Sequence, residues 1–91
     1  MAQIQQSGTP VNLSSSGAIS ATTGSLIGWH VNSTSGGTIV INDGGSSGTA
    51  LNAATASPQG WTTFPAYITS SDGAYATISG TIDVTFFFAA G

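Results

Sequence analysis

The chain has 91 residues, the length of a single domain, and it contains no Lys, Arg or Cys. Charged residues make up 3% of the chain, against roughly 25% in an ordinary soluble domain, and the net charge is −3. Nucleic acids and anionic membrane surfaces are bound mainly through Lys and Arg, so we expect neither nucleic acid nor a membrane as a partner. The 14 Ser and 13 Thr residues supply neutral hydrogen-bonding groups in place of charges.

Apolar residues make up 40% of the chain and occur in strand-length groups, which argues against disorder despite the abundance of Ser and Gly. No apolar run reaches transmembrane length, and the first residues lack the basic region and long apolar stretch of a secretory signal. We therefore expect one domain over residues 1–91, in which residues 1–10 form an extended N-terminal arm.

Runs with strand character alternate with turn residues along the chain. These runs cover residues 11–13, 18–21, 27–32, 38–41, 50–52, 61–64, 66–69, 75–79 and 81–88. The Ala-rich residues 49–56 also fit one helical turn, although we favour a strand, and Pro65 marks an edge or a bend. The sequence predicts an all-β fold, namely a single small β-sandwich or jelly-roll-like domain of about seven or eight short antiparallel strands.

Residues 24–43 contain the first clear hairpin. Ile27, Trp29 and Val31 alternate with small or polar residues, so their side chains share one face of a strand. Residues 33–37 are all Ser, Thr or Gly, which is typical of a hairpin loop. The β-branched run that follows supplies the partner strand, and Asn-Asp-Gly-Gly ends it.

The run 81–88 also alternates strictly. Ile82, Val84, Phe86 and Phe88 fall on one strand face, and Asp83, Thr85 and Phe87 fall on the other. The sequence predicts that the first set lies in the core. The complete set of predicted core residues is Ile27, Trp29, Val31, Ile39, Ile41, Ile82, Val84, Phe86 and Phe88.

Phe87 shares its strand face with polar residues, and a large apolar group in such a place often marks an interface. The alternative, which we weigh equally, is that Phe87 faces a second core layer. We take Asp83, Thr85 and Phe87 as candidate interface residues, together with Ile4, the strongly apolar residue of the N-terminal arm.

Residues 44–48 match the pattern G-x-S-x-G, which in hydrolases places a nucleophilic Ser between a strand and a helix. No convincing helix follows here, so we expect no catalytic residue. His30 is the only His, and the three Asp residues are dispersed along the sequence. The sequence therefore predicts no metal site and no other cofactor, and we expect the chain not to be an enzyme.

Several segments resemble a family of small virion proteins of tailed phages: residues 27–33 (IGWHVNS), 37–41 (GTIVI), 43–44 (DG) and 73–86 (GAYATISGTIDVTF). The resemblance implies a compact β-sandwich that serves as a structural subunit and decorates, or cements, the capsid exterior. It implies the major capsid protein or another virion protein as the partner, and it supplies no catalytic residues. The chain lacks the few Lys and Arg residues that such proteins often carry.

A small core without disulfides is marginally stable, and a chain without Lys lacks a common protection of edge strands. Both features favour a homo-oligomer, and the resemblance together with the local threefold axes of capsids favours a trimer. Two other functions stay open at this point. The chain would serve equally as a small tail or head-fibre component, or as a secreted adhesive or carbohydrate-binding β-domain that stacks sugars on Trp61 and Tyr67.

Overall fold

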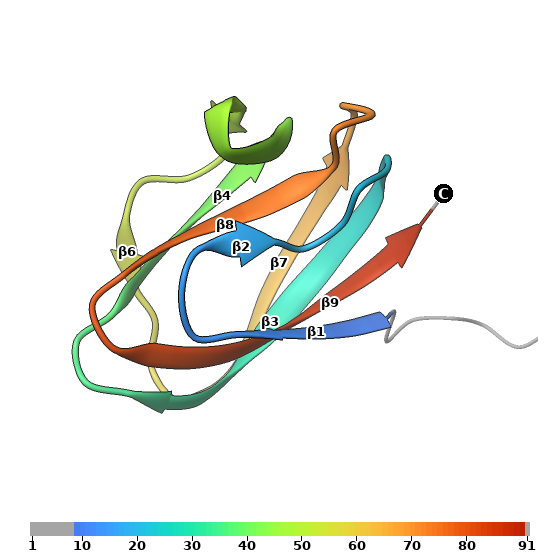
Figure 1. Cartoon of the computed structure of the whole chain (residues 1–91). Coiled ribbons are helices and arrows are strands. Elements are labelled where there is room, and N and C mark those ends of the chain that lie inside the picture. The colour runs from blue at the N-terminus through green and yellow to red at the C-terminus, as the bar shows by residue number, and fades with distance from the viewer. Residues whose placement is uncertain (1–8, 91) are drawn as a thin grey trace, which may run out of the picture.

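The computed structural model describes residues 9–90, which form two antiparallel sheets packed face to face (Figure 1). The first sheet has the order β1-β9-β3-β7, with bounds Thr9–Leu13, Ile82–Ala90, Gly24–Thr34 and Gly60–Ile68. The second sheet has the order β2-β8-β4-β5, with bounds Gly17–Ala18, Ala74–Ser79, Thr38–Asp43 and Thr49–Ala50. A further strand, β6 (Thr55–Ala56), also pairs with β4, and a short 3-10 turn, η1 (Gly45–Ser47), precedes β5.

The strand order is that of a double-sheet jelly roll. Strands β5 and β6 both pair with β4 and act as one strand interrupted by residues 51–54. With that interrupted strand counted once, the chain passes from one sheet to the other at nearly every connection, and β9 returns to lie between β1 and β3. The predicted β-sandwich is confirmed, and the described residues contain nine strands, or eight when β5 and β6 are counted as one, against the seven or eight expected.

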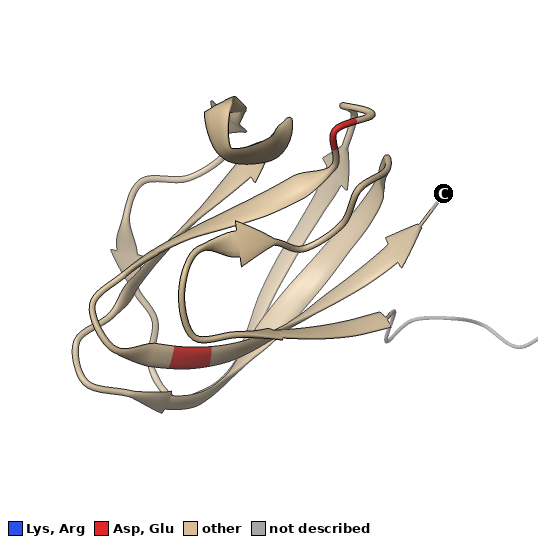
Figure 2. Cartoon of the chain, viewed as in Figure 1, with Lys and Arg blue, Asp and Glu red and all other residues tan. Residues whose placement is uncertain are grey.

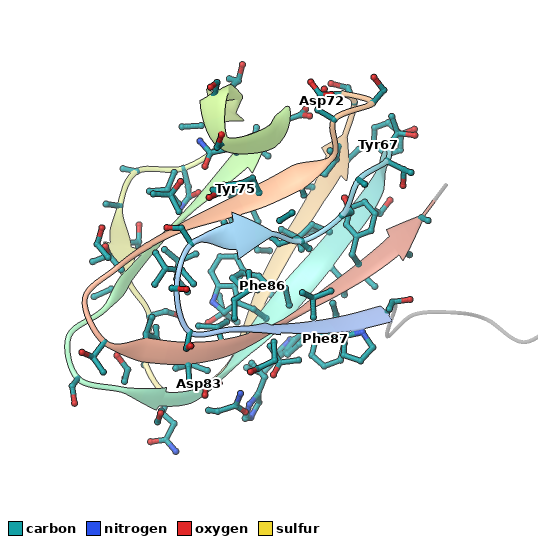
Figure 3. All side chains as sticks on the ribbon, viewed as in Figure 1. Tyr67, Asp72, Tyr75, Asp83, Phe86 and Phe87 are labelled. Atoms are coloured by element: carbon teal, nitrogen blue, oxygen red, sulfur yellow. The ribbon has the colours of Figure 1, made fainter. Side chains whose placement is uncertain are left out.

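The core lies between the two sheets and is apolar. Phe86 makes an edge-to-face contact with Trp29, whose ring centroid is 5.7 Å away, and Figure 3 shows Phe86 inside the sandwich. All but one of the predicted core residues are buried. The buried apolar residues are Ile19, Leu26, Trp29, Val31, Ile39, Ile41, Ile68, Ala74, Ala76, Ile82, Val84, Phe86 and Phe88.

The exception is Ile27, which we expected in the core and which is only half-buried. The pairing of β3 shifts register between Leu26 and Gly28 against both neighbouring strands, which is the signature of a β-bulge. The bulge breaks the alternation by one residue, so Leu26 is buried in place of Ile27. A strict two-residue period carries no sign of such a shift, and the prediction was wrong for this reason.

The predicted hairpin over residues 24–43 is wrong in its pairing, because β3 and β4 belong to different sheets, so the loop between them crosses the sandwich. Two further connections also differ from the sequence predictions. Residues 44–48, which lie between two predicted strands, contain η1, and the chain enters it through Gly44 and Gly45, both with positive φ angles. The expected strand 50–52 is limited to β5, because residues 51 and 52 bend away and the chain pairs with β4 again only at β6. The two predicted strands on either side of Pro65 are one strand, β7, with a bulge at that position.

The edges of both sheets carry protection against pairing with other chains. Pro10 lies in β1 and Pro65 lies in β7, and these are the two edge strands of the first sheet. Proline cannot donate a backbone hydrogen bond, and β7 is further disrupted by its bulge. In the second sheet, the edge strands β2, β5 and β6 have two residues each. The edges are therefore better protected than the absence of Lys suggested, and they are poor templates for association.

The carboxylate of Asp43 joins the end of β4 to the residues that follow β7. It accepts hydrogen bonds from the backbone N–H groups of Thr69 (3.1 Å) and Ser70 (3.0 Å) and from the Thr69 hydroxyl (2.9 Å). Partial burial alone would raise the pKa of Asp43, but these three hydrogen bonds outweigh it and hold the pKa below its ordinary value. The contact ties one sheet to the other at this end of the sandwich.

We expect the stability of the domain to fall in acid partly because of Asp43. Its pKa is lower in the folded chain, so the unfolded chain binds more protons as the pH falls and stability is lost below the ordinary value of 3.8. Asp43→Asn should cost about 1 kcal/mol at pH 7 and reduce this acid dependence. Urea denaturation at a series of pH values measures both effects. If the stability of Asp43→Asn falls with pH as steeply as that of the wild type, Asp43 does not contribute to the acid dependence.

Candidate functional site

The most distinctive surface is the side of the first sheet that faces away from the second sheet, which we call the outer face. Alternation along β1, β9, β3 and β7 directs one residue in two toward it. It contains both aromatic and polar side chains. The residues of the outer face used below are Asn12, His30, Asn32, Trp61, Thr63, Tyr67, Asp83, Thr85 and Phe87.

An aromatic pair lies at the centre of this face. The rings of Trp61 on β7 and Phe87 on β9 have centroids 5.5 Å apart and planes inclined at 60°. Strand β3 runs between them, and its residue at this level is Gly28, which pairs with Phe87 on one side and Thr63 on the other. A Cβ atom at Gly28 would lie 2.9 Å from Trp61 Cζ2. The absent side chain therefore provides the space in which the indole crosses β3 to reach Phe87.

Hydrogen bonding fixes the orientation of the indole, because Trp61 Nε1 donates to Thr63 Oγ1 over 2.9 Å. Trp61 nevertheless remains 50% exposed, and Tyr67, on the same strand, is 59% exposed. These two residues and Leu51 are the exposed large apolar residues among those described. Two of the three thus lie on the same face of β7, where both rings are exposed on the outer face.

A polar network lies beside the aromatic pair. Asp83 Oδ1 accepts hydrogen bonds from the side-chain amides of Asn12 (2.7 Å) and Asn32 (3.0 Å). The same two amides lie 3.2 Å and 3.0 Å from Thr85 Oγ1, and His30 Nδ1 is 3.1 Å from Asn32 Oδ1. The network therefore links β1, β9 and β3 across the outer face.

The side-chain hydrogen bonds from Asn12 and Asn32 lower the pKa of Asp83, and slight desolvation acts weakly in the opposite direction. A second register shift between β3 and β9, at Asn32, brings that amide to the carboxylate. The carboxylate of Asp83 is thus ionised and already hydrogen-bonded within the domain. Figure 2 shows it on β9, in a chain without a single cationic side chain.

The structure brings together three of the four candidate interface residues. Asp83, Thr85 and Phe87 are half-buried on the outer side of β9, and Figure 3 shows Phe87 on the opposite side of the strand from Phe86. Phe87 packs on the exposed Trp61 and not in a second core layer. Ile4 and the predicted arm as far as residue 8 lie outside the described residues, and the arm's last two residues belong to β1.

Sequence reasoning missed the two Asn side chains and the contact of Trp61 with Phe87. Asn12 and Asn32 are 71 and 51 residues from Asp83 in the sequence, and they meet it only through the order of the strands. The sequence signal for the aromatic contact was Gly28, which has no side chain in the middle of a strand. A glycine in such a place often marks the close approach of another group.

The Ser of the hydrolase-like motif and the single His lie at different sheets and do not form a catalytic pair. Ser46, the Ser of the G-x-S-x-G match, lies in η1 next to the second sheet, whereas the ring of His30 contacts Asn32 on the first sheet. Within residues 9–90, no cluster of three or more His, Cys, Asp or Glu side chains is placed to hold a metal ion. In the same part of the chain, no helix is long and apolar enough to span a membrane.

Comparisons with protein-family models, with curated proteins and with solved structures give no significant match to this chain.

Proposed function

We propose that the chain is a structural subunit of a phage virion that decorates the capsid exterior and docks on the major capsid protein through the outer face. The observation that carries this proposal is the aromatic pair Trp61–Phe87, held rigidly beside an already hydrogen-bonded polar network. The resemblance of residues 27–33, 37–41, 43–44 and 73–86 to small tailed-phage virion proteins supports the choice of partner. Jelly rolls are common in viral capsid proteins, although a shared fold alone does not assign a function.

The composition of the outer face suits a protein interface. Interface centres are enriched in aromatic residues and depleted in charge, and Trp and Tyr are over-represented among residues that dominate binding energy. Among the described residues, the one carboxylate of the outer face belongs to Asp83, which keeps two amide donors when water is excluded. Covering this face therefore buries apolar rings without leaving an unpartnered charge.

We expect Trp61→Ala to weaken docking by at least about 30-fold, because the loss of a central interface Trp typically costs 2 kcal/mol or more. The experiment incubates the labelled protein with capsid shells of the major capsid protein encoded beside its gene, and sedimentation separates bound from free protein. Leu51→Ala is the matched control, since Leu51 is also an exposed apolar residue but belongs to the second-sheet side. Equal binding by both variants and the wild type would overturn the proposal.

The homo-oligomer, with a trimer as the favoured stoichiometry, is part of the same proposal. Because the sheet edges are short or contain Pro, association through faces is favoured over edge-to-edge pairing. Native mass spectrometry of the isolated protein gives the stoichiometry in solution, and a map of the decorated particle gives it on the capsid. Monomers in solution that also sit singly on the particle, with Phe87 exposed, would exclude it.

A second function is favoured by one observation, the parallel exposure of Trp61 and Tyr67 on β7. Exposed aromatic rings on a sheet face are suitable for stacking on sugar rings, and lectin domains also use the jelly-roll architecture. A glycan array probed with the wild type and with Tyr67→Ala distinguishes the two functions. Saturable glycan binding that disappears in the variant, combined with no capsid binding, would replace the capsid proposal.

A further inference from the structure

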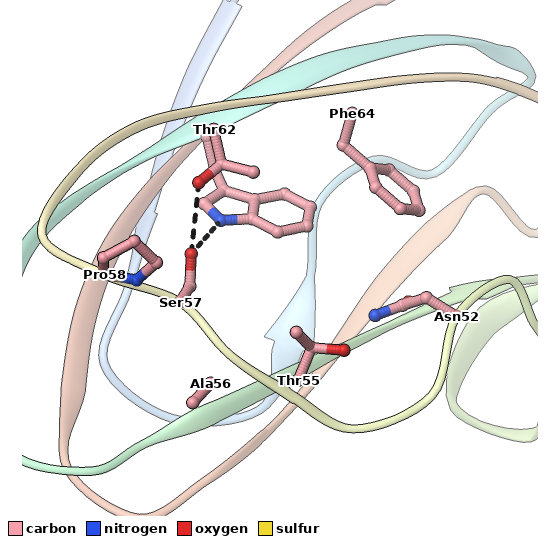
Figure 4. A pocket seen from close by; sticks show the side chains of 8 residues that line it. Asn52, Thr55, Ala56, Ser57, Pro58, Thr62 and Phe64 are labelled. Atoms are coloured by element: carbon pink, nitrogen blue, oxygen red, sulfur yellow. Dashed lines mark hydrogen bonds between the residues drawn. The ribbon is translucent and has the colours of Figure 1, made fainter.

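A pocket of about 230 Å³ opens between the two sheets, on the side where β7 faces residues 52–58 (Figure 4). It is separate from the outer face, because Trp29, Thr62 and Phe64 line it from the inner side of the first sheet. The opposite wall consists of residues from the interrupted edge of the second sheet. These are Asn52, Thr55, Ala56, Ser57 and Pro58.

The sequence explains why this space is unfilled. Four of the nine residues from 50 to 58 are Ala, and the one that lines the pocket, Ala56, has only a methyl group to fill the space opposite Trp29 and Phe64. Leu51 is the large apolar residue of this segment, and it is 39% exposed and does not line the pocket. The two-residue strands β5 and β6 therefore close this side of the sandwich only in part.

The floor of the pocket is aromatic. The rings of Trp29 and Phe64 have centroids 5.1 Å apart and planes inclined at 33°. The amide of Asn52 is engaged by the backbone of its own sheet: it accepts from Ile41 N–H (2.7 Å) and donates to the carbonyl of Ile39 (3.0 Å). The Thr55 hydroxyl donates to the Ala53 carbonyl (2.7 Å). Most of the lining is thus apolar or already hydrogen-bonded.

One hydrogen-bond donor is left over. Trp29 Nε1 donates to Ser57 Oγ (3.1 Å), and Ser57 Oγ lies 3.2 Å from Thr62 Oγ1, as the dashed lines in Figure 4 show. The hydroxyl groups of Ser57 and Thr62 each carry one hydrogen, and only one of these two hydrogens can form the bond between them. The other has no acceptor within the described part of the chain, so the pocket offers a single donor beside its aromatic floor.

We propose that this pocket binds a small six-membered aromatic ring bearing one hydrogen-bond acceptor, of the phenol type. A 150 Å³ apolar cavity is sufficient to bind benzene, whereas drug-sized ligands occupy pockets of about 300 Å³ or more, so 230 Å³ corresponds to one ring with a few further atoms. A sugar ring is disfavoured, because most of its hydroxyls would be buried against walls with no partner to offer.

Titration with p-cresol, followed by NMR, tests the proposal. The chain has two Trp residues, so the indole N–H signals of Trp29 and Trp61 report separately on the pocket and the outer face, and Trp61→Phe assigns them. We expect saturable movement of the Trp29 signal alone, with a Kd on the order of 1 mM for so small a ligand. Toluene, which lacks the acceptor, should bind about fivefold more weakly.

Two variants make the test specific. Ala56→Leu places a larger side chain in the lining and should abolish the shift, whereas Ala54→Leu makes the same change at an exposed residue outside the lining and should leave it unchanged. Movement of the Trp61 signal instead, or unaltered binding by Ala56→Leu, would overturn the pocket assignment. Equal affinity for toluene would overturn the assigned donor.

The same titration with N-acetyl-tyrosinamide distinguishes the source of the ring. Binding by both compounds assigns the pocket to a Tyr side chain of a partner polypeptide, and binding by p-cresol alone assigns it to free ring compounds. The result is independent of capsid docking, because the outer face and the pocket lie on opposite sides of the first sheet and are read by different indole signals.

Discussion

Val84→Asp should leave the domain unfolded at neutral pH. Val84 is fully buried in β9, where it pairs with Leu13 of β1 and Val31 of β3. An ionised carboxylate there has no Lys or Arg to pair with, because the chain contains neither, and burying it costs several kcal/mol. Typical domains have only about 5–15 kcal/mol of stability in total, and a core this small lies toward the lower end.

The matched control for this substitution is Thr81→Asp. Thr81 precedes β9 directly and is exposed, so the same acidic group enters the same part of the chain without burial. Far-UV circular dichroism and dispersion of amide NMR signals measure folding in both variants. A Val84→Asp variant that keeps the native spectrum and the wild-type urea midpoint would contradict the assignment of β9 to the core.

The sequence was sufficient to predict this burial because β9 is long and alternates without a bulge in its inner residues. Ile82, Val84, Phe86 and Phe88 keep a strict two-residue period, and all four are buried. The same rule failed at Ile27, where a bulge in β3 moves the alternation by one residue. Bulges depend on the pairing of both neighbouring strands, and a single strand's pattern contains no information about them.

The outer face was only partly predictable. Phe87 could be identified from the sequence because it is a large apolar residue on a polar strand face. This property can be recognised within one short segment. The partners of Asp83 did not stand out, since Asn12 and Asn32 reach it through the strand order β1-β9-β3. That order follows from the packing of the whole sandwich. The pocket had only a weak signal in the sequence, namely the Ala-rich residues 49–56. Their short side chains neither fill a core nor favour a long strand.

Gly28→Ala should destabilise the domain and disable the outer face in one step. The added Cβ would fall against the backbone carbonyl oxygen of Thr62 and within 2.9 Å of the Trp61 indole. The carbonyl belongs to the neighbouring strand and cannot rotate away, so β3 and β7 must separate locally. Such overpacking typically costs 1–3 kcal/mol, and we expect the upper part of this range because backbone must move. For a domain of this length, the melting temperature should fall by about 10–20 °C.

Gly17→Ala is the appropriate control for this prediction. Gly17 is also a strand residue with an ordinary φ angle, but its added Cβ would meet only the flexible end of the Leu13 side chain, at 2.9 Å. We expect a much smaller change in its melting temperature. The comparison separates the general cost of replacing a strand glycine from the specific cost of filling the space beneath Trp61.

The functional consequence of Gly28→Ala is the sharper part of the prediction. Trp61 and Phe87 remain in the sequence, yet the indole can no longer cross β3, so their ring contact at 5.5 Å should be lost. Nuclear Overhauser effects between the two rings measure this directly below the melting temperature. If the aromatic pair carries capsid docking, this variant should bind as weakly as Trp61→Ala, because binding depends on the position of the ring and not only on its presence. A variant that retains the ring contact but loses docking would show instead that the binding surface lies elsewhere on the sheet.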